Sequence, residues 1–530
     1  MNYRIYCKNM KNLLFILTML GIVGCSNNKV TIPSDSSVEV ISKKAGDQGN
    51  GYYRNPIIMA GDIADVGLMR VDKDYYLVHY YTAAPGHLMW HSRDLVNWEP
   101  IGNMWSGKGG GGDISKYGDL FYYYQDYRNG SENGISVRTA PNPLGPWSVP
   151  TKLEGMRHDV TVGSGPDGRR WAIAGFGTGI IKELTKDGKS YLNISESKYK
   201  GWDIPSDWDI ECNCLEGWNT FYKDGYYYIT AAQGGTSGPP TSHMVIAARS
   251  KSMEGPWENS PHNPILHTSS ADEPFWSQGN GRLIDTPDGD WYMMYHTYLK
   301  DRINLGRQIN LAPIEWTEDG WFKIPENTDL AGPLKKPKGE AVAHGFKLTD
   351  DFKGPELDLK WGFPAQTAEG RYRFADGGMY LKGNGESVKE CVPMVMPVTH
   401  TDYEYIVEMT VPEGVIGGAT IYYEKSVGYA ALGLKDGLVQ TYMGFPNGHN
   451  IGFKAPFDRN HIFIKMQFED DLVRMFYSAD GKDWTKVTAT REASGLTRNA
   501  LGPWEGLRPG IFACGNGEVL IQNFELKPLP

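Results

Sequence analysis

The sequence predicts an all-β chain in which a five-bladed β-propeller is followed by a C-terminal β-sandwich. Three observations support this fold class. The 530 residues include 64 Gly, 31 Tyr and 16 Trp, a composition that favours strands and turns over helices. A short aromatic strand recurs five times, each time directly after a turn that contains Asp or Gly. No long stretch with a 3.6-residue apolar period interrupts these copies.

Each copy is typical of a hairpin strand, because its turn residues tolerate positive φ and its aromatic side chains suit a packed, pleated surface. The copies recur about every 45 to 65 residues, close to the length of one propeller blade. A β-sandwich or a stack of loosely similar sheets stays open as the alternative. The copies are KDYYLVHYYT at Tyr75, YGDLFYYYQDY at Phe121, DGRRWAIAGFG at Trp171, KDGYYYITAAQ at Tyr227 and DGDWYMMYHTY at Trp291.

Changes in composition mark the domain boundaries. We assign 51–330 to the propeller, because the repeat fades after Trp321. Residues 331–345 are rich in Pro, Gly and Lys and are predicted to form a linker. Residues 346–530 contain alternating segments such as YEYIVEMTV and HIFIKMQFED, so we expect them to form the sandwich.

The N-terminus has the pattern of an export signal. Basic residues precede the apolar run LLFILTMLGIVG, which is too short to span a bilayer comfortably. The following IVGC and SNN resemble a bacterial lipoprotein cleavage box, so we expect 1–25 to be a lipoprotein signal peptide and Cys25 to be lipidated. The polar residues 26–50 then tether an exported protein to the cell envelope, at the periplasmic or the cell-surface face of the outer membrane. An ordinary signal peptide with an incidental Cys is the alternative.

Charge and cysteine content restrict the partners. The formal net charge is -10, and no Lys/Arg-rich stretch is interleaved with aromatic residues, so we expect no nucleic acid partner. Four cysteines follow Cys25, and an even number in an exported chain makes a disulfide possible. Cys212 and Cys214 are separated by one residue, unlike the wider spacing of zinc sites. We therefore predict no metal site and no required cofactor, and the sequence does not support a structural calcium ion.

Three carboxylates precede aromatic strands in different copies of the repeat. Asp65 lies in AGDIADVGLMRV, Asp113 in GKGGGGDISKYG and Glu216 in CLEGWNTFYKDG. Each one alone is more typical of a solvated loop. Because a propeller gathers the inner strand ends of all its blades around one axis, we expect the three to converge on one pocket.

The segments around these carboxylates resemble family 43 of the glycoside hydrolases, which are five-bladed propellers acting on xylose- and arabinose-containing glycans. The similarity covers about 51 to 325 and includes NGISVRTAPNPLGPW, ARSKSMEGPWENSPHNPIL and LGRQINLAPIEWTEDGWF, while the later residues resemble the C-terminal domain of the xylosidase-like branch. The resemblance implies that Asp65 is the general base, Glu216 the general acid and Asp113 the second Asp. It also implies that Arg307 reaches into the sugar pocket. Asn280 stands where the family commonly has His.

The expected reaction is hydrolysis of a glycosidic bond in an oligo- or polysaccharide. Asp65 would activate water and Glu216 would protonate the leaving oxygen, with inversion. Asp113 would orient Glu216 and raise its pKa by like-charge repulsion. A β-xylosidase is the main hypothesis. The alternatives are an α-L-arabinofuranosidase, a retaining enzyme, and a glycan-binding propeller without catalysis. Aromatic candidates for the sugar-stacking walls, each also consistent with packing between blades, are Trp90, Trp218 and Trp276.

Overall fold

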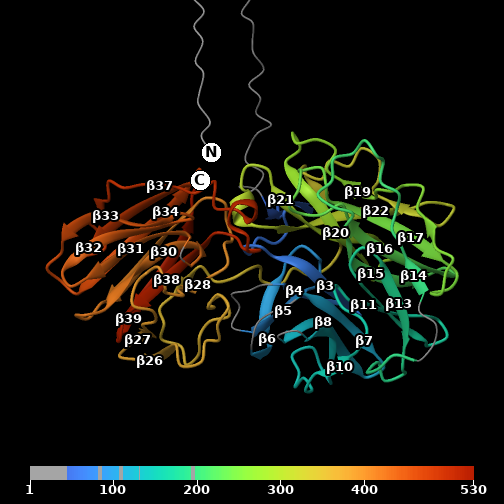
Figure 1. The fold of residues 1–530 in the computed structure, drawn as a ribbon, viewed down its shortest axis with the longest axis horizontal. Coiled ribbons are helices and arrows are strands. Elements are labelled where there is room, and N and C mark those ends of the chain that lie inside the picture. The colour runs from blue at the N-terminus through green and yellow to red at the C-terminus, as the bar shows by residue number, and fades with distance from the viewer. Residues whose placement is uncertain (1–44, 81–85, 107–110, 130–131, 193–196, 426) are drawn as a thin grey trace, which may run out of the picture. The chain divides into compact units, whose positions relative to one another are not determined.

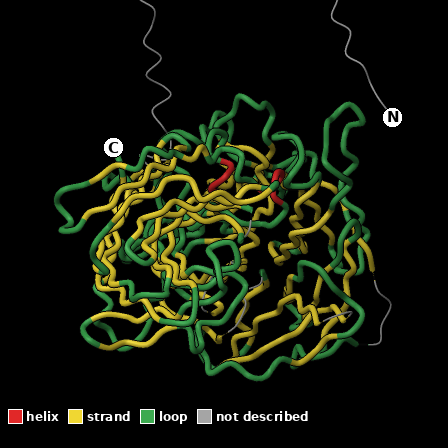
Figure 2. The backbone as a smooth tube through the Cα atoms, turned by 60° about the vertical axis from the view of Figure 1, so that its left-hand side comes forward, coloured by secondary structure: helices red, strands yellow, loops and turns green. Residues whose placement is uncertain are grey.

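The computed structural model describes residues 45–80, 86–106, 111–129, 132–192, 197–425 and 427–530. The predicted signal peptide, with Cys25, and most of the predicted tether lie outside the described residues. Within the described part of the chain, no helix has the length and apolar character needed to cross a membrane. Strands form nearly all of its regular structure, and the short helices are η2 (Ile303–Leu305) and α1 (Arg498–Leu501) (Figure 2). The prediction of an all-β chain is confirmed.

Five antiparallel sheets follow one another along the first part of the chain (Figure 1, blue to yellow-green). Within each sheet, four strands are hydrogen-bonded in sequence order. The first sheet comprises β3 (Ala64–Val71), β4 (Asp74–Tyr80), β5 (Gly86–Ser92) and β6 (Glu99–Ser106), and the second comprises β7 (Gly112–Tyr117), β8 (Leu120–Asn129), β9 (Glu132–Ala140) and β10 (Thr151–Leu153). The third comprises β11 (Thr161–Ser164), β12 (Arg170–Ala174), β13 (Gly179–Leu184) and β14 (Ser197–Tyr199). The fourth comprises β15 (Leu215–Lys223), β16 (Tyr226–Gln233), β17 (Met244–Ser250) and β18 (Glu258–Asn259), with β19 (Leu266–His267) beside β17, and the fifth comprises β20 (Phe275–Asp285), β21 (Trp291–Leu299), β22 (Gln308–Trp316) and β23 (Phe322–Lys323).

The first strands of the five sheets form a closed ring. Strands β3, β7, β11, β15 and β20 contact one another in this order, and β20 contacts β3. Each aromatic segment of the repeat forms the second strand of its sheet, after a turn with positive φ such as that at Asp72 (55°). On β8, Tyr123 and Tyr124 belong to cores on opposite faces of the second sheet. The aromatic repeat therefore supplies the packing between neighbouring sheets.

Two further sheets pack face to face in the C-terminal part, as predicted for a sandwich. On β29, Tyr403, Tyr405, Val407 and Met409 are buried and alternate with partly exposed residues. One sheet comprises β25 (Thr349–Asp350), β26 (Tyr372–Ala375), β27 (Gly378–Lys382), β29 (Tyr403–Thr410), β34 (His461–Glu469), β35 (Leu472–Ser478), β36 (Thr485–Lys486), β37 (Arg491–Glu492) and β39 (Glu518–Pro528). The other comprises β28 (Met394–Val395), β30 (Ile416–Glu424), β31 (Gly428–Lys435), β32 (Leu438–Phe445), β33 (Gly448–Pro456) and β38 (Arg508–Cys514).

Part of the predicted tether and part of the predicted linker pair with the same strand at the start of the propeller region. Strand β2 (Tyr52–Arg54) lies between β1 (Gly46–Asp47) and β24 (Leu334–Lys335) in a small sheet. The Lys336 ammonium lies 3.0 Å from the buried carboxylate of Asp94. The segment that enters the first sheet is thus fixed against the segment that leaves the fifth.

The sandwich is attached to the ring of sheets through polar contacts of Asn304 in η2. Its side-chain amide donates to the Asp471 carboxylate (2.9 Å) and to the Ala493 carbonyl (3.1 Å), and its backbone carbonyl accepts from the Leu507 N–H (2.8 Å). These bonds fix the residues just before β38, two of which line the cavity described below.

The cysteines divide into a bonded pair and two thiols. Cys212 and Cys214 form a disulfide, while Cys391 and Cys514 are buried and free. The disulfide lies directly before β15, the strand that carries Glu216.

Candidate active site

A cavity of about 700 Å³ lies where the first strands of the sheets begin. Asp65 on β3, Glu216 on β15 and Asn280 on β20 line it together with Arg307. Further lining residues come from several sheets and from the sandwich, and include Gln125, Asp126, His158, Asp159, His243, His296, Trp504 and Glu505. The structure therefore brings together Asp65, Glu216 and Arg307, three of the residues singled out in the sequence.

Irregular backbone turns these side chains toward the cavity, at the start of β3 and β15 and in the middle of β20. The pairing of β3 with β4 shifts register between Ala64 and Gly67, and Asp65 has φ of 51°. The pairing of β15 with β16 shifts directly after Glu216, where Gly217 has φ of 62°. Asn280 lies at a similar irregularity in β20, with φ of 53°. A β-bulge re-aims a side chain in this way, at the cost of ladder hydrogen bonds.

The Asp65 carboxylate has one hydrogen-bond donor and two basic side chains close to it. One oxygen accepts a hydrogen bond from the Asn280 side-chain amide (2.9 Å). The same oxygen lies 3.6 Å from the Arg307 guanidinium and 3.8 Å from Nδ1 of His296. Neither ring nitrogen of His296 has a hydrogen-bond partner within the described protein. The wall around Asp65 thus offers buried polar atoms to a polar ligand.

Arg307 is a fixed positive charge beside Asp65. Its guanidinium makes two hydrogen bonds to the Asp62 carboxylate (3.0 and 2.9 Å), which also accepts from the Arg307 backbone N–H (2.9 Å). The indole ring of Trp504 lies against the guanidinium, at 4.4 Å from its carbon to the ring centroid. Burial alone would lower the pKa of Arg307, but Asp62 and Asp65 raise it above its usual range.

Glu216 is paired with His158, a residue that sequence reasoning missed. Nε2 of His158 lies 2.7 Å from the Glu216 carboxylate. This hydrogen bond raises the pKa of His158 to about 9. Burial would raise the pKa of Glu216, but the hydrogen bond to His158 and the charges of His158, His243 and Arg307 together lower it. Both pKa shifts favour an ionised Glu216 beside a protonated His158, contrary to the expectation of a raised pKa for Glu216.

Asp159 lies beside the same pair and was also missed. Its carboxylate accepts a hydrogen bond from the Gly217 N–H (2.9 Å) and lies 3.8 Å from Nε2 of His158. Burial and the nearby charge of Glu216 raise the pKa of Asp159 to about 7. A sequence signal existed: Asp159 precedes the aromatic residue of the third copy, Trp171, by about as many residues as Asp65 and Glu216 precede theirs.

Asp113 is absent from the lining of the cavity. It occupies the same position in β7 as Asp65 in β3, but the pairing of β7 with β8 has no register shift, so its side chain is not re-aimed. Its carboxylate accepts hydrogen bonds from Arg282 (2.9 Å) and from the Val162 N–H (3.1 Å), and both ionic side chains are buried. Burial raises the pKa of Asp113. The side chain thus joins the second, third and fifth sheets, rather than contacting Glu216.

The three predicted stacking residues lie away from the cavity. Trp90 and Trp218 are buried in cores between sheets, where their indole N–H groups donate to His79 and to the Gly175 carbonyl. Trp276 lines a separate pocket of about 180 Å³. The tryptophan that lines the cavity is Trp504, which comes from the C-terminal part and carries no signal in the repeat.

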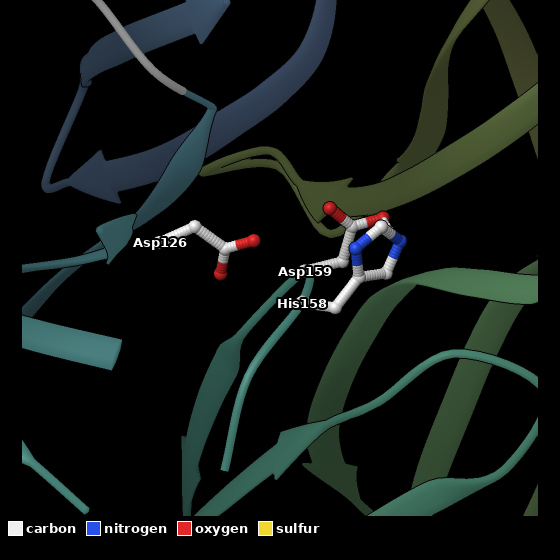
Figure 3. Close-up of side chains that lie close together, drawn as sticks. All are labelled: Asp126, His158 and Asp159. Atoms are coloured by element: carbon white, nitrogen blue, oxygen red, sulfur yellow. Dashed lines mark ion pairs between the residues drawn. The ribbon is translucent and has the colours of Figure 1, made fainter. Parts of the chain in front are cut away.

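Asp126, His158 and Asp159 form the one group among the described residues with three side chains that could hold a metal ion (Figure 3). Their candidate ligand atoms lie within 4.8 Å of one another. Figure 3 shows the His158 ring beside the Asp159 carboxylate, with Asp126 approaching from β8. Because His158 is hydrogen-bonded to Glu216, a metal on Nε2 would compete with that bond, and we assign no metal to this group.

Comparison with known proteins agrees with this architecture. Residues 53–322 match the family model of glycosyl hydrolases family 43, and 349–520 match that of the beta xylosidase C-terminal Concanavalin A-like domain. A non-reducing end alpha-L-arabinofuranosidase of Bacteroides ovatus is 30% identical over 62% of this chain and 65% of its own length. A xylosidase/arabinosidase of Butyrivibrio fibrisolvens is 31% identical over 50% of this chain and 55% of its own. The chain therefore spans less than two thirds of these two relatives.

Solved structures show the same fold. The GH43 protein BlXynB of Bacillus licheniformis superposes with a TM-score of 0.79, at 23% identity, over 90% of this chain and all of that one. The family model covers just over half of the sequence, and it includes Asp65, Asp159 and Glu216 in the cavity. The chain therefore belongs to family 43 of the glycosyl hydrolases and is a glycosidase.

Proposed function

We propose that this chain removes a terminal xylose- or arabinose-type sugar from plant glycans by an inverting, two-carboxylate mechanism. The observation that carries the proposal is one cavity that contains Asp65 and the Glu216–Asp159–His158 group. We further propose that the five sheets are the blades of one propeller, since their first strands form a closed ring around this cavity.

Asp65 acts as the base. It takes a proton from a water molecule, whose oxygen attacks the anomeric carbon while the bond to the leaving oxygen breaks. Asn280 and Arg307 hold the carboxylate oxygen that they share, which leaves the other oxygen to accept the proton. Inversion requires a separation of about 6.5 to 9.5 Å between the two catalytic carboxyl groups, so that the water fits between them.

Glu216 delivers a proton to the leaving oxygen. In the resting arrangement that proton lies on His158, and the short hydrogen bond between the two provides its path to Glu216. Transfer of the proton from His158 to Glu216 neutralises both side chains. This transfer becomes favourable when a bound substrate displaces water, because separated charges are less stable in a cavity without water.

Asp159, rather than Asp113, disfavours ionisation of Glu216. Its carboxylate lies in the same hydrogen-bonded group and interacts with the charge of Glu216. When Asp159 is ionised, a second negative charge on Glu216 is costly, and the proton is held on Glu216 more strongly.

The relatives and the lining of the cavity support two candidate sugars and action at a chain end. The C-terminal match to a beta xylosidase domain favours a β-xylosidase, whereas the Bacteroides ovatus relative favours an α-L-arabinofuranosidase. Trp504 and Glu505 close part of the cavity from the sandwich, which suits the end of a glycan chain rather than its middle. A glycan-binding propeller without catalysis would bind the same sugars without releasing product.

The carboxylate assignments predict large kinetic losses. We expect Glu216→Gln and Asp65→Asn each to lower kcat on an aryl β-xyloside or aryl α-L-arabinofuranoside by about 100-fold or more, because proton transfer of this kind contributes that much. The matched controls Glu254→Gln and Asp119→Asn remove exposed carboxylates in turns between strands and should retain normal rates. Near-normal turnover in Glu216→Gln or Asp65→Asn contradicts the assignment, and binding without turnover in the unaltered protein favours the non-catalytic alternative.

The proton on His158 predicts a specific pH profile. Because the pKa of His158 is about 9, this residue keeps its proton up to mildly alkaline pH. We therefore expect kcat/KM to fall only as pH rises through about 9. In His158→Gln the proton must lie on Glu216 itself, so we expect the alkaline limb to move down by about 2 pH units while turnover persists. The control His461→Gln, on β34, should leave the limb in place. An unmoved limb in His158→Gln would exclude His158 as the source of the proton.

Asp159→Asn and Asp113→Asn should differ in their effect on stability. The pKa of Asp159 is raised in the folded state, so the wild type loses stability as pH rises from about 4 to about 7, and Asp159→Asn removes this loss. We therefore expect the melting temperature of Asp159→Asn, relative to that of the wild type, to increase as pH rises from about 4 to about 7. We also expect this variant to turn over substrate more slowly. Asp113→Asn removes the charged partner of the buried Arg282 and should cost about 3–5 kcal/mol near neutral pH, with a smaller cost at acid pH, where Asp113 itself takes up a proton. Equal melting behaviour of the two variants would refute this distinction.

We also propose that the protein is exported and lipid-anchored through Cys25, as its N-terminal pattern predicts. When the protein is expressed in a bacterium that exports and lipidates it, Cys25→Ser should lose fatty-acid labelling and move from the membrane fraction to the soluble fraction. Cys7→Ser is the matched control and should keep both the label and the membrane association. Labelling that persists in Cys25→Ser would rule out this anchor.

A further inference from the structure

A second cavity, of about 710 Å³, lies beside the active site and carries positive charge. We call it the basic groove. It is lined by Arg157, Phe176, Lys198 and Lys200, with Asn133, Met156 and Ile180 among the other residues, and no acidic side chain lines it. This contrasts with the whole chain, whose formal net charge is -10.

The basic groove adjoins the side of the active site where the proton donor lies. The Phe176 ring packs edge-on against the His158 ring, with centroids 5.2 Å apart, and His158 is hydrogen-bonded to Glu216. The backbone on both sides of Phe176 is tied to the active site, since the Gly175 N–H donates to the His158 carbonyl (2.8 Å) and the Gly177 N–H to the Leu215 carbonyl (3.0 Å). The groove is therefore fixed to the strand that carries Glu216.

The groove has the features of a site for a charged sugar. Phe176 is 58% exposed, and an aromatic ring in this position can stack against a sugar. Arg157 and Lys200 are exposed and form no ion pair with another described residue. An anionic group bound between them would gain two charge-assisted hydrogen bonds. In a glycan the common anionic group of that size is the carboxylate of a uronic acid.

We propose that the basic groove binds a uronic acid on the leaving-group side of the substrate. The inference rests on the proposed function, because it places the leaving part of the glycan next to Glu216, which protonates the leaving oxygen. A terminal sugar then occupies the cavity with Asp65, and the acidic sugar further along the glycan extends past Phe176 to Arg157 and Lys200.

The test compares two substrates of equal length, a linear xylotetraose and a xylotetraose with a glucuronic acid branch on the leaving side. We expect a higher kcat/KM for the branched substrate at low salt, and a preference that disappears in 0.5 M NaCl because salt screens exposed charges. The double variant R157M/K200M should lower the ratio of the two kcat/KM values about tenfold. The control K353M/K382M removes two exposed charges on the sandwich and should preserve the ratio.

The outcomes separate this inference from the proposed function. Hydrolysis of the linear substrate without a preference for the branched one, or a preference that survives in R157M/K200M, overturns the inference and leaves the function intact. If neither substrate nor an aryl glycoside is hydrolysed, the proposed function fails, and the groove is then tested by calorimetry. Binding of the branched tetrasaccharide or of trigalacturonate that weakens about tenfold in R157M/K200M supports the groove, and equal affinity for both forms of the protein overturns it. The trigalacturonate arm shows whether the uronic acid alone is recognised or whether the xylan chain is needed.

Discussion

The active site depends on irregular backbone at the inner ends of the sheets. A regular strand would place its second residue in the core, as β7 does with Asp113, whose carboxylate is bonded to Arg282. The register shifts at Asp65, Glu216 and Asn280 direct these side chains into the cavity instead. The same ring of strands thus supplies both a buried ion pair and carboxylates that line the cavity, and local backbone geometry decides which of the two places a carboxylate occupies.

The charges in the cavity are arranged in two groups. Arg307, fixed by Asp62 and by the ring of Trp504, places positive charge beside Asp65. On the other side, Glu216 shares a short hydrogen bond with His158. One carboxylate therefore lies beside a fixed positive charge and the other is hydrogen-bonded to His158, an arrangement that suits hydrolysis by two carboxylates. The sandwich takes part in this arrangement through Trp504, which ties the second domain to the chemistry of the first.

Much of the fold could be predicted from the sequence, because the aromatic strands and their turns carry a strong local signal. The positions of Asp65 and Glu216 could be predicted for the same reason. The prediction that Asp113 lies beside Glu216 was wrong. The residues around Asp113 do not show whether its strand has the register shift that would direct the side chain into the cavity. Trp90 and Trp218 pack between sheets, and Trp504 lies far from the repeat in the sequence. Contacts of this kind depend on how distant segments meet, which a reading of local pattern does not supply.

If Asp65 activates water, the sugar is released without a covalent sugar–enzyme bond. Proton NMR of the first product released from an aryl glycoside, recorded before the free sugar mutarotates, measures this directly. We expect an anomeric configuration opposite to that of the substrate. A product that retains the configuration of the substrate would mean that a carboxylate attacks the sugar itself, and would contradict the role of Asp65 as the base.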